Sequence, residues 1–121
     1  MFKILLIEDD KTLIEMYQMI LSDYGYQVET AENGLIGLKK VLELKPDLVL
    51  LDVIMPKMSG LDVLRKLKSD PQTKAIPIII LSNLSSQKQS EEALKMGALK
   101  YLIKSNLDPE DLVQTIKQVL G

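Results

Sequence analysis

The 121-residue chain contains no cysteine, no histidine and no tryptophan. The lack of cysteine excludes disulfides, thiol catalysis and cysteine-based zinc sites. The lack of histidine excludes histidine metal ligands, histidine general bases and any phosphohistidine carried by this chain. No apolar run approaches the ~20 residues that span a membrane, and three acids within the first ten residues do not fit a signal peptide. We therefore expect no membrane segment and a cytoplasmic location.

A surplus of positive charge is also missing. The chain has 15 basic and 17 acidic residues, a net charge of −2, so we expect no direct binding to nucleic acid. Hydrophobic residues make up 46% and charged residues 26%, the profile of a globular domain. The length suits one domain over residues 1–121 and leaves no room for a second module of normal size.

Short apolar runs alternate with segments of helical spacing. The runs that predict buried strands are residues 4–7, 27–30, 48–51, 76–81 and 99–103. The segments that predict helices are residues 11–24, 35–44, 61–67, 87–96 and 108–120. Asp108 and Pro109 are typical of a helix start, and Gly97 of a helix end. The order is (βα)5, which predicts an α/β fold with a parallel sheet covered by helices on both faces.

Polar residues follow four of the five predicted strands. Glu8 and Asp9 follow the first strand, Asp52 the third, Ser82 the fourth and Lys104 the fifth. Ligands of open parallel sheets gather at the carboxyl ends of the strands, and neighbouring strands lie only ~4.8 Å apart. Clustered carboxylates repel one another unless a cation neutralises them, and Mg²⁺ bound by carboxylate and phosphate oxygens does so. The lysine and the hydroxyl suit a phosphoryl group.

Each of these residues also has an ordinary structural interpretation. Acids after a strand often cap the next helix, and we expect Asp10 to do so. Ser82 alone is typical of a turn, and Lys104 alone of a solvated strand end. No helix begins directly after Asp52, so capping does not explain it. The coincidence at four strand ends favours a site.

Five stretches in this order resemble the receiver domains of two-component response regulators. They are ILLIEDD at 4–10, LLDVIMPKMSG at 50–60, ILS at 80–82, GA at 97–98 and KYLIK at 100–104. The resemblance covers the entire chain. It implies a doubly wound, flavodoxin-like fold with a five-stranded parallel sheet in strand order 2-1-3-4-5. It also implies that Asp52 accepts a phosphoryl group from a histidine kinase or a histidine phosphotransfer protein in a Mg²⁺-dependent reaction.

The resemblance assigns roles to the residues around Asp52. Asp9 is expected to bind Mg²⁺ directly, Glu8 through a water molecule, and Ile54 through its backbone carbonyl. Lys104 is expected to pair with Asp52 and then with the phosphoryl oxygens.

The resemblance further implies a switch. Ser82 is expected to be the switch hydroxyl and Tyr101 the switch aromatic, although a half-buried strand residue is the plain alternative for Tyr101. The output face would comprise the fourth helix, fifth strand and fifth helix, and would bind a downstream protein or form a phosphorylation-dependent homodimer of an otherwise monomeric chain. The family commonly has proline where Ser105 follows Lys104, so the loop there is expected to differ.

The neighbours of the acceptor suggest a long-lived signal. Ile54, two residues after Asp52, and Leu84, two after Ser82, are apolar and unable to position or deprotonate a water molecule. We therefore expect slow self-dephosphorylation.

Three other functions fit the sequence less well. An aspartate-nucleophile hydrolase would place a second Asp where Ile54 stands, and a flavin carrier would need a Ser-, Thr- and Gly-rich loop after the first strand. A receiver-like scaffold that is never phosphorylated usually lacks the acidic pair, Asp52 or Lys104, and this chain has them all. The sequence thus favours a signalling switch that catalyses only its own phosphorylation and dephosphorylation.

Overall fold

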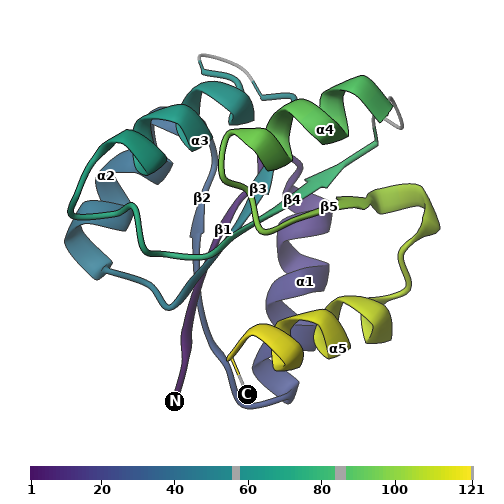
Figure 1. Ribbon diagram of the computed structural model, residues 1–121. Helices are drawn as coiled ribbons and strands as arrows, with labels where there is room; N and C mark the ends of the chain where they lie inside the picture. The colour runs from purple at the N-terminus through teal and green to yellow at the C-terminus, as the bar shows by residue number, and fades with distance from the viewer. Residues whose placement is uncertain (56–57, 84–86, 121) are drawn as a thin grey trace.

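Five parallel strands form a single sheet in the order β2-β1-β3-β4-β5 (Figure 1). The structure is a computed structural model, and it describes residues 1–55, 58–83 and 87–120. In chain order the elements are β1 (Lys3–Ile7), α1 (Lys11–Asp23), β2 (Gln27–Ala31), α2 (Gly34–Leu44), β3 (Leu48–Asp52), α3 (Gly60–Ser69), β4 (Ile78–Ser82), α4 (Gln87–Lys95), β5 (Lys100–Ile103), the 3₁₀ turn η1 (Lys104–Asn106) and α5 (Pro109–Leu120). The predicted fold class and strand order are confirmed.

The sheet separates two layers of helices. Helices α2, α3 and α4 cover one face, and α1 and α5 cover the other (Figure 1). Successive strand side chains point to opposite faces, so Leu5 and Ile7 belong to the first layer and Ile4 and Leu6 to the second. Both faces of the central strands are therefore buried, which is why their sequences are continuous apolar runs rather than alternating ones.

Helix ends follow local rules that the sequence already carries. The Asp10 carboxylate accepts hydrogen bonds from the amides of Thr12 and Leu13 and caps α1, as predicted. Helix α5 begins at Pro109, directly after Asp108, whose carbonyl accepts from the Leu112 amide. Gly97 has φ of +110° just beyond α4, a conformation that favours glycine.

Two boundaries differ from the prediction by two residues: α3 ends at residue 69 rather than 67, and β4 begins at residue 78 rather than 76. Ile76 belongs to the preceding turn, where its amide donates to the Thr73 carbonyl, and Pro77 has no amide hydrogen to add to the ladder. Within the described part of the chain, no helix combines the length and apolar character needed to cross a membrane.

Candidate functional site

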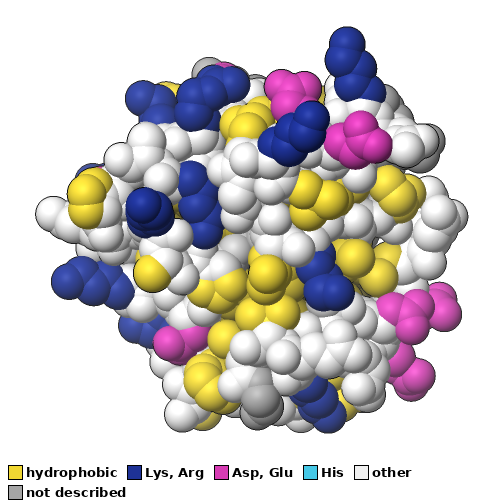
Figure 2. All heavy atoms as spheres, in the orientation of Figure 1, with side chains coloured by type: hydrophobic (Ala, Val, Ile, Leu, Met, Phe, Trp, Pro, Cys, Tyr) yellow, Lys and Arg dark blue, Asp and Glu magenta, His cyan; other side chains and the backbone are white. Residues whose placement is uncertain are grey.

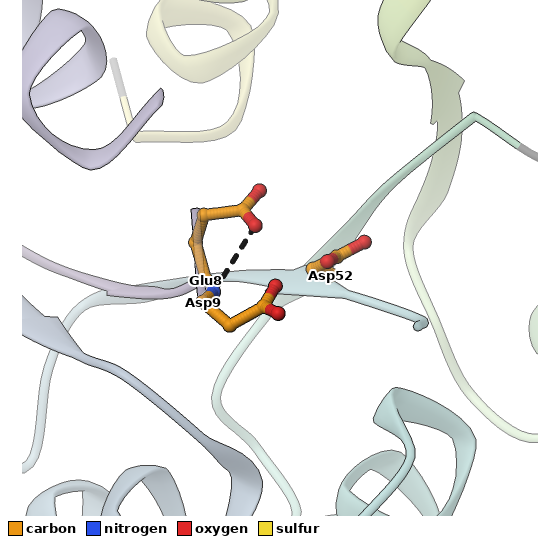
Figure 3. A group of neighbouring side chains, drawn as sticks. All are labelled: Glu8, Asp9 and Asp52. Carbon is orange, nitrogen blue, oxygen red and sulfur yellow. Dashed lines mark hydrogen bonds between the residues drawn. The ribbon is translucent and has the colours of Figure 1, made fainter. Parts of the chain in front are cut away.

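The sheet register brings three carboxylates to one edge. Ile7 of β1 pairs with Leu51 of β3. The residues that follow this pair, Glu8 directly after β1 and Asp52 at the end of β3, therefore lie side by side. Glu8, Asp9 and Asp52 each offer a carboxylate oxygen within 4.8 Å of the others. Figure 3 shows the Asp9 side chain extending from the end of β1 toward Asp52. The predicted convergence of the first and third strand ends is thus present.

Lys104 reaches this cluster from the β5 edge of the sheet. It lies in η1, directly after edge strand β5, and its Nζ is 3.3 Å from Oδ1 of Asp52. A second and shorter contact joins Nζ to Oε1 of Glu8. All three side chains are less than one-tenth exposed, so the lysine neutralises two carboxylates in a poorly solvated place.

The Glu8 carboxylate is held on both oxygens. Oε1 accepts from Lys104, while Oε2 accepts from the backbone amides of Asp9 (3.1 Å) and Asp10 (3.2 Å). Burial raises the pKa of Glu8 above 4.5; the Lys104 hydrogen bond opposes this shift, and the negative charge of Asp52 adds to it. Asp9 differs, since its side chain is exposed and free to turn toward a ligand.

The pKa of Lys104 is shifted by burial and by the neighbouring carboxylates of Glu8 and Asp52. Burial alone would lower its pKa, but the hydrogen bond to Glu8 and the charges of Asp52 and Glu8 outweigh burial and raise the pKa above 10.5. The ammonium form is therefore the one that the site stabilises at neutral pH.

A cavity of about 300 Å³ opens over these groups. It is lined by Glu8, Asp9, Asp10, Leu13, Asp52, Ile54, Asn83 and Lys104. Leu13 and Asn83 were not predicted to line the site. Asn83 directly follows Ser82, so its position one residue beyond the fourth strand end was a usable signal. Leu13 reaches the cavity from the first turn of α1, which the strand ends do not indicate. The Ile54 side chain is 60% exposed at the rim of the cavity.

The two predicted switch residues lie beyond the acidic cluster. Ser82 is completely buried at the end of β4, one residue past Leu81, which pairs with Asp52. Tyr101 of β5 is partly buried and packs against the apolar layer under α2, α3 and α4. Ser105 lies in η1, and no cis peptide bond occurs among the described residues. Leu84 lies outside the described residues.

The donor set fits a hard divalent cation. Three carboxylates meet a single ammonium group, so negative charge remains to be neutralised, and the side chains that the cluster offers bind through oxygen only. Mg²⁺ prefers such ligands and keeps several water molecules, for which the open cavity leaves room. The cluster is compatible with Mg²⁺ binding and with phosphorylation of an aspartate.

A doubly wound parallel sheet with an acidic cluster and a lysine at its carboxyl edge defines a protein of the receiver class, whose members are signalling switches. The chain belongs to the family of response regulator receiver domains, since the model of that family matches residues 4–117. Protein PilH of Pseudomonas aeruginosa is 38% identical over 123 aligned positions, which cover 100% of this chain and 99% of PilH.

Other relatives place the same domain inside longer proteins. The transcriptional regulatory protein ZraR of Klebsiella oxytoca is 41% identical over 98% of this chain, but the match spans only 26% of ZraR. Among solved structures, the chemotaxis protein CheY4 of Vibrio cholerae superposes with a TM-score of 0.91 at 33% identity, covering 98% of both chains. The receiver domain of Klebsiella pneumoniae RstA, activated with BeF₃, gives 0.90 at 30% identity over 98% of this chain and 97% of that one.

Proposed function

We propose that this chain is a phosphorylation-dependent switch whose acceptor is Asp52. The phosphoryl donor is the phosphohistidine of a sensor kinase or of a phosphotransfer protein. The observation that carries the proposal is the position of the Asp52 carboxylate: it lines a cavity, lies within 4.8 Å of Asp9, and is 3.3 Å from the Lys104 ammonium. A carboxylate in this position is able to bind Mg²⁺ together with Asp9, and Lys104 lies close enough to bind the phosphoryl oxygens.

The transfer requires an in-line attack. An Asp52 carboxylate oxygen forms the new bond to phosphorus, while the bond from phosphorus to the donor imidazole nitrogen breaks and its electron pair stays on the imidazole. Bound Mg²⁺ would neutralise charge on the phosphoryl oxygens. Asp9, Asp52 and the Ile54 carbonyl would hold the ion. Glu8, fixed by Lys104 and two backbone amides, is suited to an indirect contact through water.

Lys104 and Ser82 would respond to the new group. The phosphoryl oxygens offer Lys104 a stronger partner than the single Asp52 oxygen that it contacts at 3.3 Å. A hydrogen bond from the Ser82 hydroxyl to a phosphoryl oxygen would draw the end of β4 toward the site. Tyr101 would then rotate into the space that this movement leaves, which changes the packing beneath α4.

The output surface would be α4, β5 and α5. Helix α4 suits a moving element, because Ala93 is its only buried residue within the described part of that helix. A downstream protein or a second phosphorylated copy would recognise this surface, and residues 1–121 would form one receiver domain. The cytoplasmic location stays a prediction.

Acetyl phosphate tests the acceptor directly. The protein is incubated with acetyl phosphate and MgCl₂, and intact-mass spectrometry follows the addition of one phosphoryl group. We expect the parent protein to be modified and Asp52→Asn to remain unmodified, while Asp47→Asn, a change to an exposed aspartate away from the site, behaves like the parent. Modification of Asp52→Asn at the parental level would refute Asp52 as acceptor, and no modification of any variant would favour an unphosphorylated scaffold.

The lifetime of the acyl phosphate tests the role of the rim. Ile54 is exposed beside the acceptor and carries no group that positions water. We expect Ile54→Asn to release phosphate faster than the parent, and faster still when combined with Leu84→Glu. Phosphate release measured after removal of the donor should show this order; equal rates would contradict the assignment.

A further inference from the structure

The face of the molecule in Figure 2 mixes apolar side chains with cations and acids. A face of mixed charge does not indicate the chemistry of a partner. The cavity over Asp52 differs, because the proposed function gives it a defined occupant, a phosphoryl group. The lining of this cavity includes the amide side chain of Asn83, directly after β4, which the proposed transfer does not use.

Asn83 lies on the same side of the sheet as the acceptor. Asp52 of β3 pairs with Leu81 of β4, and Asn83 is two residues beyond Leu81. Side chains two residues apart along a strand point to the same face. Leu50 and Leu81 both belong to the layer that α1 and α5 cover, so Asp52 and Asn83 are directed to that side at the edge of the sheet. Both side chains line the same cavity, in agreement with this register.

The spacing of the two residues suits a contact through a phosphoryl group. Neighbouring strands lie ~4.8 Å apart and each residue adds ~3.3 Å along a strand, so an offset of two residues separates the Cα atoms of Asp52 and Asn83 by roughly 8 Å. An asparagine side chain and an aspartate that carries a phosphoryl group are together long enough to span this separation. The cavity of about 300 Å³ leaves room for the group between them.

Ser82 is placed differently from Asn83. It is completely buried, and it is not among the described residues that line the cavity. It follows Ile80 by two residues, so it is directed to the layer that α2, α3 and α4 cover. The proposed hydrogen bond from Ser82 therefore requires the end of β4 to move, whereas Asn83 lines the cavity before any movement.

Hydrogen-bond donors are scarce in the cavity. Its described lining consists of four carboxylates, two apolar side chains, Lys104 and Asn83. The ammonium group of Lys104 is shared between Glu8 and Asp52. Asn83 thus contributes the one uncharged side chain in the described lining that is able to donate a hydrogen bond.

A phosphoryl group in transfer requires more than the one donor that Lys104 supplies. Its negative charge is spread over three equatorial oxygens. In the proposed reaction one of these oxygens would face the Mg²⁺ ligands Asp9 and Asp52, and a second would face Lys104. The third is left for a donor from the β4 side of the cavity, where Asn83 lies.

We infer that the side-chain amide of Asn83 donates a hydrogen bond to a phosphoryl oxygen, first in the incoming donor molecule and then in the acyl phosphate on Asp52. The inference rests on the proposed function, since it requires Asp52 as the acceptor. The amide keeps its hydrogen and forms no bond to phosphorus, so its effect is to bind and orient the group. The competing explanation is steric, in which Asn83 matters only through its size at the opening of the cavity.

Binding of BeF₃⁻ measures the contact without chemistry. This ion bonds to an aspartate oxygen in the place of a phosphoryl group, and its fluorine atoms stand in for the phosphoryl oxygens. Its apparent affinity is read from amide chemical shifts as it is added in the presence of MgCl₂. We expect Asn83→Ala and Asn83→Leu each to weaken binding roughly tenfold, as for loss of a hydrogen bond to a charged group. Gln114→Ala, which removes an exposed amide of α5 outside the cavity, should bind like the parent.

Labelling rates with two small donors show which part of the donor Asn83 contacts. Acetyl phosphate has an oxygen leaving group and phosphoramidate a nitrogen leaving group, but both transfer the same phosphoryl group. We expect Asn83→Ala to lower the second-order rate of labelling by the same factor for both donors, measured by intact-mass spectrometry. Loss of rate with only one donor would place the contact on the leaving group and overturn the inference.

The two replacements at Asn83 separate hydrogen bonding from size. Alanine is smaller than asparagine and leucine is of similar size, yet neither side chain donates a hydrogen bond. The inference is overturned if Asn83→Ala binds BeF₃⁻ as tightly as the parent while Asn83→Leu binds it weakly, because size alone would then govern. It is also overturned if Gln114→Ala loses as much affinity as Asn83→Ala.

Failure of the proposed function gives a different result. In that case the parent and Asp52→Asn would respond alike to BeF₃⁻, and the inference would fall with the acceptor. If only the inference is wrong, the parent and both Asn83 variants bind BeF₃⁻ equally, and Asp52→Asn alone does not bind it. Urea denaturation confirms that each variant is folded.

Discussion

Substitution of Gly60 by alanine should damage the protein far more than most glycine changes. Gly60 begins α3, and its amide donates to the Val53 carbonyl at 2.8 Å, which holds the start of the helix against the end of β3. A Cβ at this position would lie 2.1 Å from the Asp52 carbonyl oxygen and 2.7 Å from the Val53 Cα. Both neighbours are backbone atoms, so no side-chain rotation relieves the clash.

The size of the effect follows from these distances. To reach ordinary contact at 3.4 Å, the Cβ and the Asp52 oxygen must separate by roughly 1.3 Å. Overpacking that moves the backbone costs about 3 kcal/mol or more, and a helix-propensity gain of up to ~1 kcal/mol offsets only part of it. For a domain of this length, a net loss of about 2–3 kcal/mol lowers Tm by roughly 10 °C.

Gly37→Ala is the matched control. An added Cβ there meets only side-chain atoms of the buried Ile7, with Cδ1 at 2.5 Å, Cγ1 at 2.9 Å and Cγ2 at 3.1 Å, so the clash is with a side chain rather than with backbone. We expect the free energy of unfolding to fall less for Gly37→Ala than for Gly60→Ala in urea denaturation, because a side chain gives way more easily than backbone. Gly60→Ala should also be labelled more slowly by acetyl phosphate at temperatures where it remains folded, because Asp52 is displaced. If Gly60→Ala unfolded at the same urea concentration as the parent, the steric reasoning would be wrong.

Three further predictions concern hydrogen bonds and charge. Buried Thr73 donates to the Leu67 carbonyl at 2.6 Å, so Thr73→Val should cost about 1–2 kcal/mol in urea denaturation, whereas Thr115→Val, which removes an exposed hydroxyl bond, should cost less than ~0.5. The raised pKa of Lys104 means that its contribution to stability is complete at neutral pH and is lost as pH rises through its folded pKa above 10.5. Alkaline denaturation of Lys104→Met should therefore be less steep than that of the parent, and parallel curves would contradict this assignment. The pKa of Glu8 is raised above 4.5, so the stability that protonated Glu8 contributes is present below pH 4.5 and is lost as pH rises through the folded pKa. In the absence of Mg²⁺, the stability of Glu8→Gln should not show this fall with rising pH. A pH profile of stability equal to that of the parent would count against the burial of Glu8.

Most of the architecture was predictable because it depends on local patterns. The buried strands are short runs of Ile, Leu and Val, and the end of each strand places its next polar residue at a common edge. Asp10 could be predicted as a helix cap because capping needs only its own side chain and the next three amides. The convergence of Asp9 and Asp52 followed from parallel pairing alone.

Features that depend on packing between distant segments were not predictable. The sequence suggested that Lys104 pairs with Asp52, but its shorter contact is with Glu8, a choice set by where the end of β5 places the lysine relative to the end of β1. The exposure of Leu35 and Leu42 on α2 was also not predictable, because apolar residues occur on every side of that helix. Only contact with Ile7 and Val63 determines that Gly34 and Gly37 face inward.

Among the described residues, the two apolar clusters on opposite faces of the sheet share no side chain. Packing strain spreads through touching atoms, so the helices on either side are free to diverge at different rates during evolution. Because α4 packs on one layer and α5 on the other, a change in either interior reaches only one helix of the proposed output surface.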